Sequence, residues 1–425
     1  MSEARAQLES TWTELTAIVG HEHIQPCCED DAVDGKQPFG VIAPANAQQL
    51  AKVLSYCSST GLAVITRGGG TKLGLGNRPQ KADLVVSTAR LNSVVEHAWD
   101  DMTTTVEAGC TIEDLQSVLR QHGQRLAADP LQPAKATVGG VLATADTGSL
   151  RIRYGGIRDL VLGLELALPD GSLIKAGGKV VKNVAGYDLT KLAIGSMGTL
   201  GVITRAVFRL HPVPFAIASY SASLASASEA MKVALAILDS HLVYTGLQLR
   251  AQRADQVTLD VRFEGIAESL QDQFIKLGRV TGAHRFTEST PEIWLARPKL
   301  FADAANSVIC KCSVLPAQVA SLSDAVFRQA DLAGVAGTLV AQGTGLVDVR
   351  LDAASLEACA ATVKALRKEL EDLQGTLIVQ QCPAALKDEL DVWGATNEAL
   401  PLMRQIKEKF DPARILNPGR FVGGI

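Results

Sequence analysis

A glycine-rich run with basic and hydroxyl side chains is the segment of this sequence best suited to chemistry. It reads TRGGGTKLGLGN over residues 66–77 and directly follows the apolar stretch LAVIT at 62–66. Three consecutive glycines let the backbone turn tightly, so that successive N–H groups approach a phosphate with no Cβ in the way. Arg67 adds a positive charge and Thr71 a hydroxyl donor. The run predicts a phosphate-binding loop, and a flexible surface turn is the alternative for an isolated GGG.

The spacing of these glycines excludes two common nucleotide motifs. The run is neither GxGxxG nor GxxxxGK[ST], and no helix is expected directly after it. A dinucleotide fold of the Rossmann type and a P-loop are therefore not supported.

A second segment of small residues follows further along the chain. It reads PAKATVGGVLATADTGSLRIRYG over residues 133–155, and its glycine pair comes after a strand-like TV. This density of small residues predicts a backbone-lined slot that admits a flat ring, with threonine hydroxyls as donors.

Alternating strands and helices position both segments. An extended stretch at 41–44 precedes a helix that begins at Asn46 and ends at Gly61, and the strand 62–66 completes a βαβ unit. A second helix is expected from Thr111. A hairpin turning at Asp170–Gly171, a helix capped by Asp188 and a strand at 201–210 follow.

Residues 215–382 are expected to have a different order of elements, in which strand–helix–strand–strand–helix–strand occurs twice. This is the split βαβ or ferredoxin-like plan, and two copies predict one antiparallel sheet with helices on one face. The expected strands are 219–225, 242–249, 256–263, 283–288, 307–315, 337–342, 345–352 and 376–382, and the expected helices are 227–240, 266–279, 316–333 and 354–373.

Composition and charge exclude several classes of protein. The 425 residues are 47% apolar and 20% charged, which is typical of a globular chain with two or three compact units. A net charge of −4 disfavours nucleic acid as a partner. The first fifteen residues, MSEARAQLESTWTEL, contain no apolar core and are not a secretory signal. The eight cysteines form no CxxC pair and the histidines are scattered, so no metal or iron–sulfur site is expected.

Four motifs in this order resemble the vanillyl-alcohol-oxidase/PCMH flavoprotein superfamily. They are the RGGGT loop, the VGG–ATADTG slot, KNVAGYDLTKLAIGSMGTLGVIT at 182–204 and the terminal LNPGRF at 416–421. Within the superfamily they look like the FAD-linked 2-hydroxy-acid oxidases, and in particular like the smaller FAD-binding subunit of bacterial glycolate oxidases (glycolate dehydrogenases). The resemblance covers 37–214 and 400–421, while the middle region is similar in plan only.

The resemblance implies an α+β fold with a two-part FAD-binding domain and an antiparallel-sheet cap. A helical lead-in would occupy 1–36, and a PCMH-type FAD-binding domain 37–214. A cap of two ferredoxin-like units would span 215–382, and a helical tail at 383–425 would return to the flavin.

The resemblance also assigns FAD contacts residue by residue. The pyrophosphate would be wrapped by Arg67, Gly68, Gly69, Gly70, Thr71, Leu73 and Gly74. The dinucleotide would be lined by Asp129, Pro130, Val138, Gly139 and Gly140. The ribityl chain and the isoalloxazine would be bordered by Ala143, Thr144, Thr147 and Gly148, the adenine by Ile203, and the flavin ring by Asn417.

The cofactor implied is non-covalent FAD. Thr71–Lys72 occupies the neighbourhood of the family's linking histidine, and the slot at 138–148 holds no cysteine.

The chain departs from the family's metal-assisted dehydrogenases. Their cap holds a metal on paired histidines, whereas the cap here has only His241 and His284. No metal is therefore expected, and the catalytic base is unassigned. Lys311 and Arg350, on cap strands, are candidates for clamping a carboxylate. Lys182 and Asn183 are interpreted as a structural cap, with a flavin contact as the alternative, and Tyr187 is interpreted as a residue of the helix start that packs.

The resemblance implies an enzyme that oxidises a 2-hydroxy acid of the glycolate type to the 2-oxo acid. The chain would be one FAD-binding subunit of a complex, with a second FAD-binding subunit and an iron–sulfur subunit that accepts the electrons. A non-catalytic electron-relay subunit and a stand-alone dehydrogenase are the alternatives. The expected location is cytoplasmic, with contact to the inner membrane only through partner subunits.

Overall fold

The computed structural model describes residues 2–179, 188–282, 284–304, 306–396 and 398–425, in two compact units. Unit 1 comprises Met1–Asp146, Ile157–Pro212 and Thr396–Ile425, and unit 2 comprises Thr147–Gly156 and Val213–Ala395. Lys182, Asn183 and Tyr187 lie outside the described residues.

Unit 1 begins with a four-stranded sheet in the order β1-β2-β4-β3, in which β2, β4 and β3 are parallel. Its strands are β1 (Ile24–Pro26), β2 (Gly40–Ile42), β3 (Val64–Arg67) and β4 (Leu84–Ser87). Helix α2 (Ala47–Thr60) makes the crossover from β2 to β3, as predicted. Its N-cap Asn46 accepts a hydrogen bond from the Gln49 N–H, and Gly61 ends it in a left-handed conformation. Helix α1 (Ser2–Val19) buries Leu15 in the same core.

A five-stranded antiparallel sheet forms the second half of unit 1, in the order β5-β6-β10-β8-β9. Its strands are β5 (Val94–Ala98), β6 (Thr103–Glu107), β8 (Val161–Ala167), β9 (Leu173–Gly177) and β10 (Val202–Arg209). The predicted hairpin is present between β8 and β9, with Gly171 at a φ of 85° in its turn. The remaining elements of the unit are α3 (Ile112–Arg120), β7 (Gln124–Arg125), α4 (Val138–Thr144), α6 (Ile157–Leu160), α7 (Leu189–Ala193), β11 (His211–Pro212) and α13 (Leu400–Phe410).

Helix α4 corrects one expectation from the sequence. The TV before the glycine pair was expected to be a strand, but Thr137 is the N-cap of α4 and its hydroxyl accepts a hydrogen bond from the Gly140 N–H. The local β preference of Thr and Val is overridden because a threonine hydroxyl serves as an N-cap, and because Val138 and Val141 pack into the core of unit 1.

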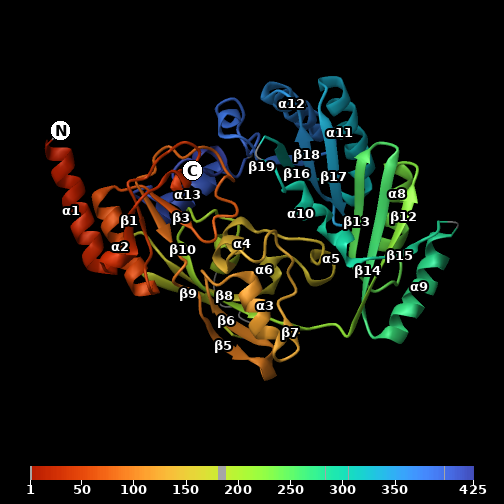
Figure 1. Ribbon diagram of the computed structural model, residues 1–425, viewed down its shortest axis with the longest axis horizontal. Helices are drawn as coiled ribbons and strands as arrows, with labels where there is room; N and C mark the ends of the chain where they lie inside the picture. Colours follow the sequence, from red (N-terminus) through yellow and green to blue (C-terminus); the bar gives the residue numbers. More distant parts are fainter. Residues whose placement is uncertain (1, 180–187, 283, 305, 397) are drawn as a thin grey trace. The chain divides into compact units, whose positions relative to one another are not determined.

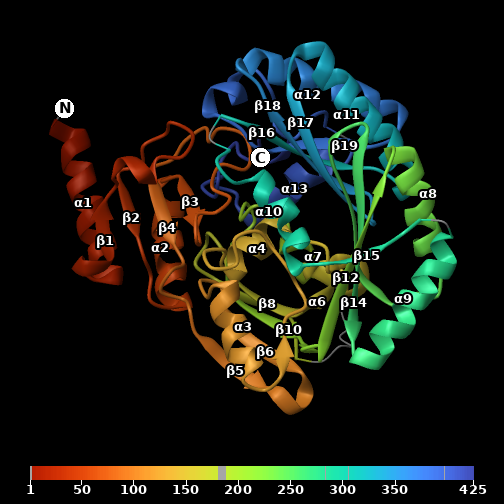
Figure 2. The same ribbon diagram turned by 45° about the vertical axis from the view of Figure 1, so that its right-hand side comes forward.

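Unit 2 contains one eight-stranded antiparallel sheet in the order β15-β12-β14-β13-β17-β18-β16-β19. Figures 1 and 2 both show its long helices gathered on one side of the sheet, as the repeated pattern predicts. The strands are β12 (Ala216–Leu224), β13 (Tyr244–Arg253), β14 (Gln256–Gly265), β15 (Thr287–Ser289), β16 (Val308–Ser313), β17 (Ala336–Gln342), β18 (Leu346–Asp352) and β19 (Thr376–Gln381), and the helices are α8 (Ala227–Leu238), α9 (Ala267–Thr281), α11 (Val319–Ala333) and α12 (Leu356–Asp372). The order strand–helix–strand–strand–helix–strand occurs twice, and β13 and β17 join the two halves.

The two units depart from the expected boundaries in two places. Residues 147–156, which include α5 (Arg151–Tyr154), belong to unit 2 because Tyr154 donates a hydrogen bond to Glu264 and Arg262 donates one to Ser149. Unit 2 also continues past 382 to Ala395, since the Val379 N–H bonds to the Val392 carbonyl.

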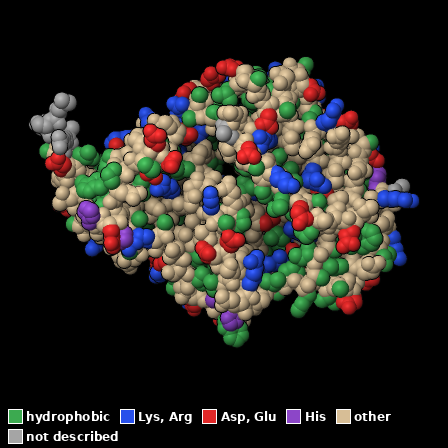
Figure 3. Space-filling view, viewed as in Figure 1, with side chains coloured by type: hydrophobic (Ala, Val, Ile, Leu, Met, Phe, Trp, Pro, Cys, Tyr) green, Lys and Arg blue, Asp and Glu red, His purple; other side chains and the backbone are tan. Residues whose placement is uncertain are grey.

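Two surface properties follow from the described residues. None of the described helices is long and apolar enough to span a bilayer. On the face drawn in Figure 3, basic and acidic side chains are interspersed and no extended basic patch is visible.

The core of unit 2 generates a stability prediction. Phe263 is fully buried, whereas Phe215 in the same unit is 93% exposed. We expect Phe263→Ala to lower the free energy of unfolding of unit 2 by about 3–5 kcal/mol, because it leaves a cavity in the core. Phe215→Ala, the matched control, should change it by less than about 0.5 kcal/mol. Urea unfolding monitored by circular dichroism measures both, and equal effects of the two variants would contradict the assignment of the core.

Candidate functional site

A pocket in unit 1 lies where segments far apart in the sequence meet. These include the loop that follows β3, helix α4, the turn that leads into β10, and the C-terminal segment at Arg420. The lining residues are 66–73, 88, 136, 137, 139–141, 143, 144, 146, 197, 198, 201–203 and 420.

The glycines of the loop differ in how much space is available for a side chain. A Cβ on Gly69 would lie 1.7 Å from the Lys135 carbonyl oxygen, and a Cβ on Gly68 would lie 2.1 Å from the Thr137 hydroxyl. These two glycines therefore let the loop pack directly against the segment before α4. A Cβ on Gly70 would meet nothing closer than 4.0 Å, but Gly70 has a φ of 73°, which favours glycine.

The loop presents free N–H donors to the pocket. Its carbonyls at Gly70 and Lys72 accept hydrogen bonds from the Leu73 and Leu75 N–H groups. In contrast, the backbone N–H groups of Gly69, Gly70 and Thr71 have no acceptor among the residues that the structure describes. Consecutive unpaired N–H groups around a left-handed glycine form a concave site for an anion. The pocket thus has the donor geometry that a phosphate or diphosphate needs.

Two of the cations at the pocket are already paired with carboxylates. Arg67 Nη1 lies 2.5 Å from Asp31 Oδ1, and Lys72 Nζ lies 2.9 Å from Asp146 Oδ1. Burial alone would raise the pKa of Asp31, but its hydrogen bonds with Arg67 and Cys28 outweigh burial and hold the pKa below its usual value. These pairs fix the two side chains at the rim, so the N–H groups of the loop remain the free donors.

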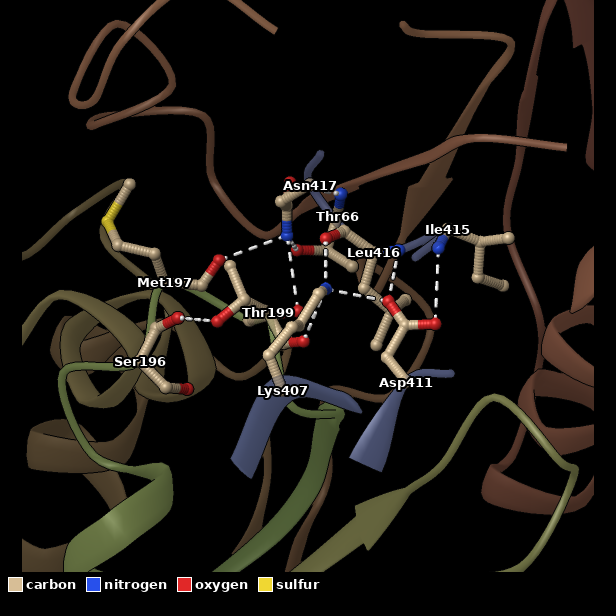
Figure 4. A network of polar contacts seen from close by, with 10 residues as sticks. Thr66, Ser196, Met197, Thr199, Lys407, Asp411, Ile415, Leu416 and Asn417 are labelled. Carbon is tan, nitrogen blue, oxygen red and sulfur yellow. Dashed lines mark hydrogen bonds and ion pairs between the residues drawn. The ribbon is translucent and has the colours of Figure 1, made fainter. Parts of the chain in front are cut away.

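The C-terminal segment supplies a third cation. Arg420 lines the pocket with 2% of its surface exposed and donates hydrogen bonds to the carbonyls of Leu73 and Leu75. Burial lowers the pKa of this guanidinium to about 10, although Asp34 opposes the shift, so Arg420 stays charged at neutral pH. Figure 4 shows the adjacent Asn417, whose amide Nδ2 donates to the Thr66 hydroxyl and the Met197 carbonyl.

Most of the residues expected to contact FAD lie on this pocket. Those that line it are Arg67, Gly68, Gly69, Gly70, Thr71, Leu73, Gly139, Gly140, Ala143, Thr144 and Ile203. Those that do not are Gly74, Asp129, Pro130, Val138, Thr147, Gly148 and Asn417. Val138 is buried in the core of unit 1, and Thr147 and Gly148 belong to unit 2. Their contacts with FAD remain predictions.

Several lining residues were missed from the sequence. Lys72 and Asp146 are an ion pair across long sequence separation, and Arg420 reaches the loop from the far end of the chain. The turn before β10 could have been predicted to line the pocket from the glycines of the run GSMGTLGVIT, because two of these glycines do line it.

The carboxylate-clamp candidates in unit 2 lie among acidic partners. Arg350 bonds to Asp352 at 2.8 Å and to the carbonyls of Leu300 and Ala302, and it lines a cavity of about 830 Å³ within unit 2. Lys311 on β16 is the cross-strand neighbour of Asp348 on β18. Asp348, which is 1% exposed, forms an ion pair with Arg297. No group of His, Cys, Asp and Glu side chains suited to a metal occurs among the described residues.

Comparison with known proteins gives the class of this fold and site. Residues 38–177 match the model of the FAD binding domain, and residues 392–421 match that of the C-terminal domain of FAD linked oxidases. The solved structure of p-cresol methylhydroxylase with substrate bound covers 98% of this chain and 96% of its own, with a TM-score of 0.76 and 15% sequence identity. The chain thus contains an FAD binding domain and the C-terminal domain of FAD linked oxidases on a PCMH-type fold, and its cofactor is FAD.

Two relatives are similar to this chain over most of its length. Glycolate oxidase subunit GlcD of Bacillus subtilis is 27% identical and aligns with 90% of this chain and 88% of its own length. The D-lactate dehydrogenase of Archaeoglobus fulgidus is 29% identical and aligns with 90% of this chain and 91% of its own length. The chain is therefore similar, over nine tenths of its length, to oxidoreductases named for small 2-hydroxy acids.

The residues of the pocket fit FAD. The free N–H groups at Gly69, Gly70 and Thr71 suit the diphosphate, and small residues on α4 leave room beside them. When bound, FAD supplies the electron acceptor. The residues of this chain bind and orient it.

The close approach of the loop generates a prediction for FAD binding. Gly69→Ala should weaken FAD binding at least about tenfold, or about 1.4 kcal/mol, because its Cβ would collide with the Lys135 carbonyl and displace the loop. Gly278→Ala in α9 is the matched control, since a Cβ there also meets no atom within 4 Å and the residue does not line the pocket. It should change the dissociation constant by no more than about twofold. Quenching of flavin fluorescence measures both, and equal affinity of the two variants would contradict this packing.

The Arg67–Asp31 pair generates a prediction for pH. The pKa of Asp31 is lower in the folded chain than the value of about 3.9 in the unfolded chain. Its contribution to stability is therefore fully present above the unfolded pKa and is lost as the pH falls through the folded pKa. The difference in free energy of unfolding between wild type and Asp31→Asn should be constant near neutral pH and should shrink in acid below about pH 4. Urea unfolding at stepped pH measures it, and a difference that grows in acid would show the opposite shift.

Proposed function

We propose that this chain is an FAD-binding subunit of a complex of the glycolate oxidase type, which oxidises a small 2-hydroxy acid to the 2-oxo acid. The observation that carries the proposal is the anion-binding loop at Gly69–Thr71 in a chain similar, nearly end to end, to GlcD and to a D-lactate dehydrogenase. The FAD is held without a covalent bond, since Thr71 and Lys72 stand where related proteins have a linking histidine.

Oxidation of a 2-hydroxy acid removes two electrons and two protons from the substrate. FAD bound in this pocket would supply the acceptor for the hydride of the C2–H bond, and the hydroxyl proton would pass to a base. The electrons would then pass to an iron–sulfur partner subunit, and the lack of cluster-binding spacing among the cysteines of this chain is consistent with such a partner. A second FAD-binding subunit completes the proposed complex. Contact with the inner membrane is through these partners, and the chain itself is cytoplasmic.

A second candidate function is favoured by the charges of unit 2. The chain would then be an FAD-binding electron-relay subunit with no substrate turnover of its own. Arg350, a candidate clamp for a substrate carboxylate, is paired with Asp352 at 2.8 Å, and Arg297 is paired with Asp348 at 2.9 Å. The Arg297–Asp348 pair is almost fully buried, and breaking a buried pair to admit a substrate is costly.

Anaerobic reduction separates the two functions. The purified chain, loaded with FAD, is mixed without oxygen with glycolate or D-lactate, and the visible absorbance of the flavin is followed. Bleaching by the chain alone supports turnover within this subunit. A flavin that bleaches only after the partner subunits are added supports the relay function. If neither substrate bleaches the flavin under either condition, while dithionite does, the proposal of a 2-hydroxy-acid oxidase is wrong.

A further inference from the structure

The C-terminal segment is joined to the strand that leads into the anion-binding loop. The Val64 N–H on β3 donates to the Ile415 carbonyl, and the Asn417 N–H donates back to the Val64 carbonyl. Beyond this bridge, the Asn77 N–H donates to the Arg420 carbonyl. Because β3 is the edge strand of its sheet, these bonds cover an edge that would otherwise be open. The C-terminal segment therefore lies beside β3 and beside the loop that follows this strand.

A buried ion pair holds this segment in place. Lys407 Nζ lies 2.7 Å from Asp411 Oδ2, and both side chains are almost fully buried. Asp411 also accepts hydrogen bonds from the N–H groups of Ile415 and Leu416, and Lys407 donates to the Thr199 carbonyl at 2.8 Å (Figure 4). The pair therefore ties α13, the turn before β10 and the chain around Leu416 into one network.

Asn417 bridges two walls of the pocket. Its Nδ2 lies 3.0 Å from the Thr66 hydroxyl on one wall, and 3.0 Å and 3.3 Å from the carbonyls of Met197 and Gly198 on the other. Its Oδ1 accepts a bond from the Thr66 N–H at 3.4 Å. Asn417 is 1% exposed, and its amide is engaged by protein atoms on both sides. These contacts suit a residue that sets the spacing of the two walls.

Arg420 fixes the orientation of peptide groups in the loop. It donates to the carbonyl of Leu73, and to that of Leu75 at 2.7 Å. With these carbonyls held by Arg420, and those of Gly70 and Lys72 held within the turn, four carbonyls of the loop are engaged. The N–H groups at Gly69–Thr71 find no acceptor among the described residues and remain available as donors.

We propose that Asn417 and Arg420 are positioning residues that form the FAD-competent pocket before FAD binds, so that docking of the C-terminal segment precedes cofactor binding. Arg420 would affect binding of the diphosphate by orienting the peptide groups of the loop. Asn417 would affect FAD binding by setting the distance between the two walls of the pocket. The proposal rests on FAD as the cofactor and is independent of which substrate is oxidised. Its failure is therefore distinguishable from failure of the proposed reaction.

Hydrogen exchange of the FAD-free protein tests the proposal. Arg420→Gln removes the charge and the paired donors, and the exposed Arg414→Gln in the same segment is the matched control. The reporters are the N–H groups of Leu73 and Leu75, which are hydrogen-bonded within the loop. In FAD-free Arg420→Gln we expect faster exchange confined to the peptide containing residues 68–75, and FAD binding weakened by roughly tenfold. Arg414→Gln should match wild type in both measurements.

Two outcomes would overturn the proposal. Weaker FAD binding with unchanged exchange in the FAD-free protein would mean that Arg420 contacts FAD directly. Unchanged affinity would mean that the contacts of Arg420 are structural only. If Arg420→Gln does not fold, the same measurement is made on Asn417→Ala. We then expect faster exchange in the peptides containing residues 66–75 and 196–199. Unchanged exchange in these peptides would contradict the proposal. Arg420→Lys, which keeps the charge, should restore part of the affinity.

Discussion

At Gly69 the loop after β3 lies so close to the segment before α4 that a Cβ would come within 1.7 Å of the Lys135 carbonyl oxygen. This contact requires glycine, and it joins two segments that are far apart in the sequence. The loop turns at Gly70, and the N–H groups of Gly69, Gly70 and Thr71 have no acceptor in the part of the chain that the structure describes. The candidate anion-binding site of unit 1 depends on this approach.

The charges around the site follow from the same geometry. Arg67 and Lys72 are paired with Asp31 and Asp146, so the loop carries basic side chains without a large uncompensated positive charge. Buried charges persist only when they are paired or hydrogen-bonded. An anion bound at the loop would therefore be recognised mainly by oriented peptide dipoles, with Arg420 as the nearby buried cation. This arrangement suits a phosphate or diphosphate bound through backbone N–H groups.

Much of the fold could be predicted from local patterns. The helix from Asn46 to Gly61 has an amphipathic pattern and recognisable caps, and the repeated strand and helix order of unit 2 is visible in its alternating periodicity. The loop at 66–77 was found because consecutive glycines are informative by themselves. Helix α4 was missed because the β preference of Thr137 and Val138 concealed an N-cap.

What the sequence did not predict depends on contacts between distant residues. The Lys72–Asp146 pair, the hydrogen bonds from Arg420 to Leu73 and Leu75, and the membership of residues 147–156 in unit 2 exist only once the chain has folded. Asn417 was expected at the flavin ring on the basis of the family. Its amide instead joins Thr66 to Met197, and a direct contact with flavin stays a prediction.

We infer that this chain holds FAD through the backbone of its glycine loop, without a covalent link. The most direct measurement is to denature the purified, FAD-saturated and washed protein by heat, remove the precipitate, and quantify flavin in the supernatant by chromatography. The account predicts release of one intact FAD per chain. Flavin that stays with the precipitated protein, or a native protein that retains no FAD after saturation and washing, would contradict it.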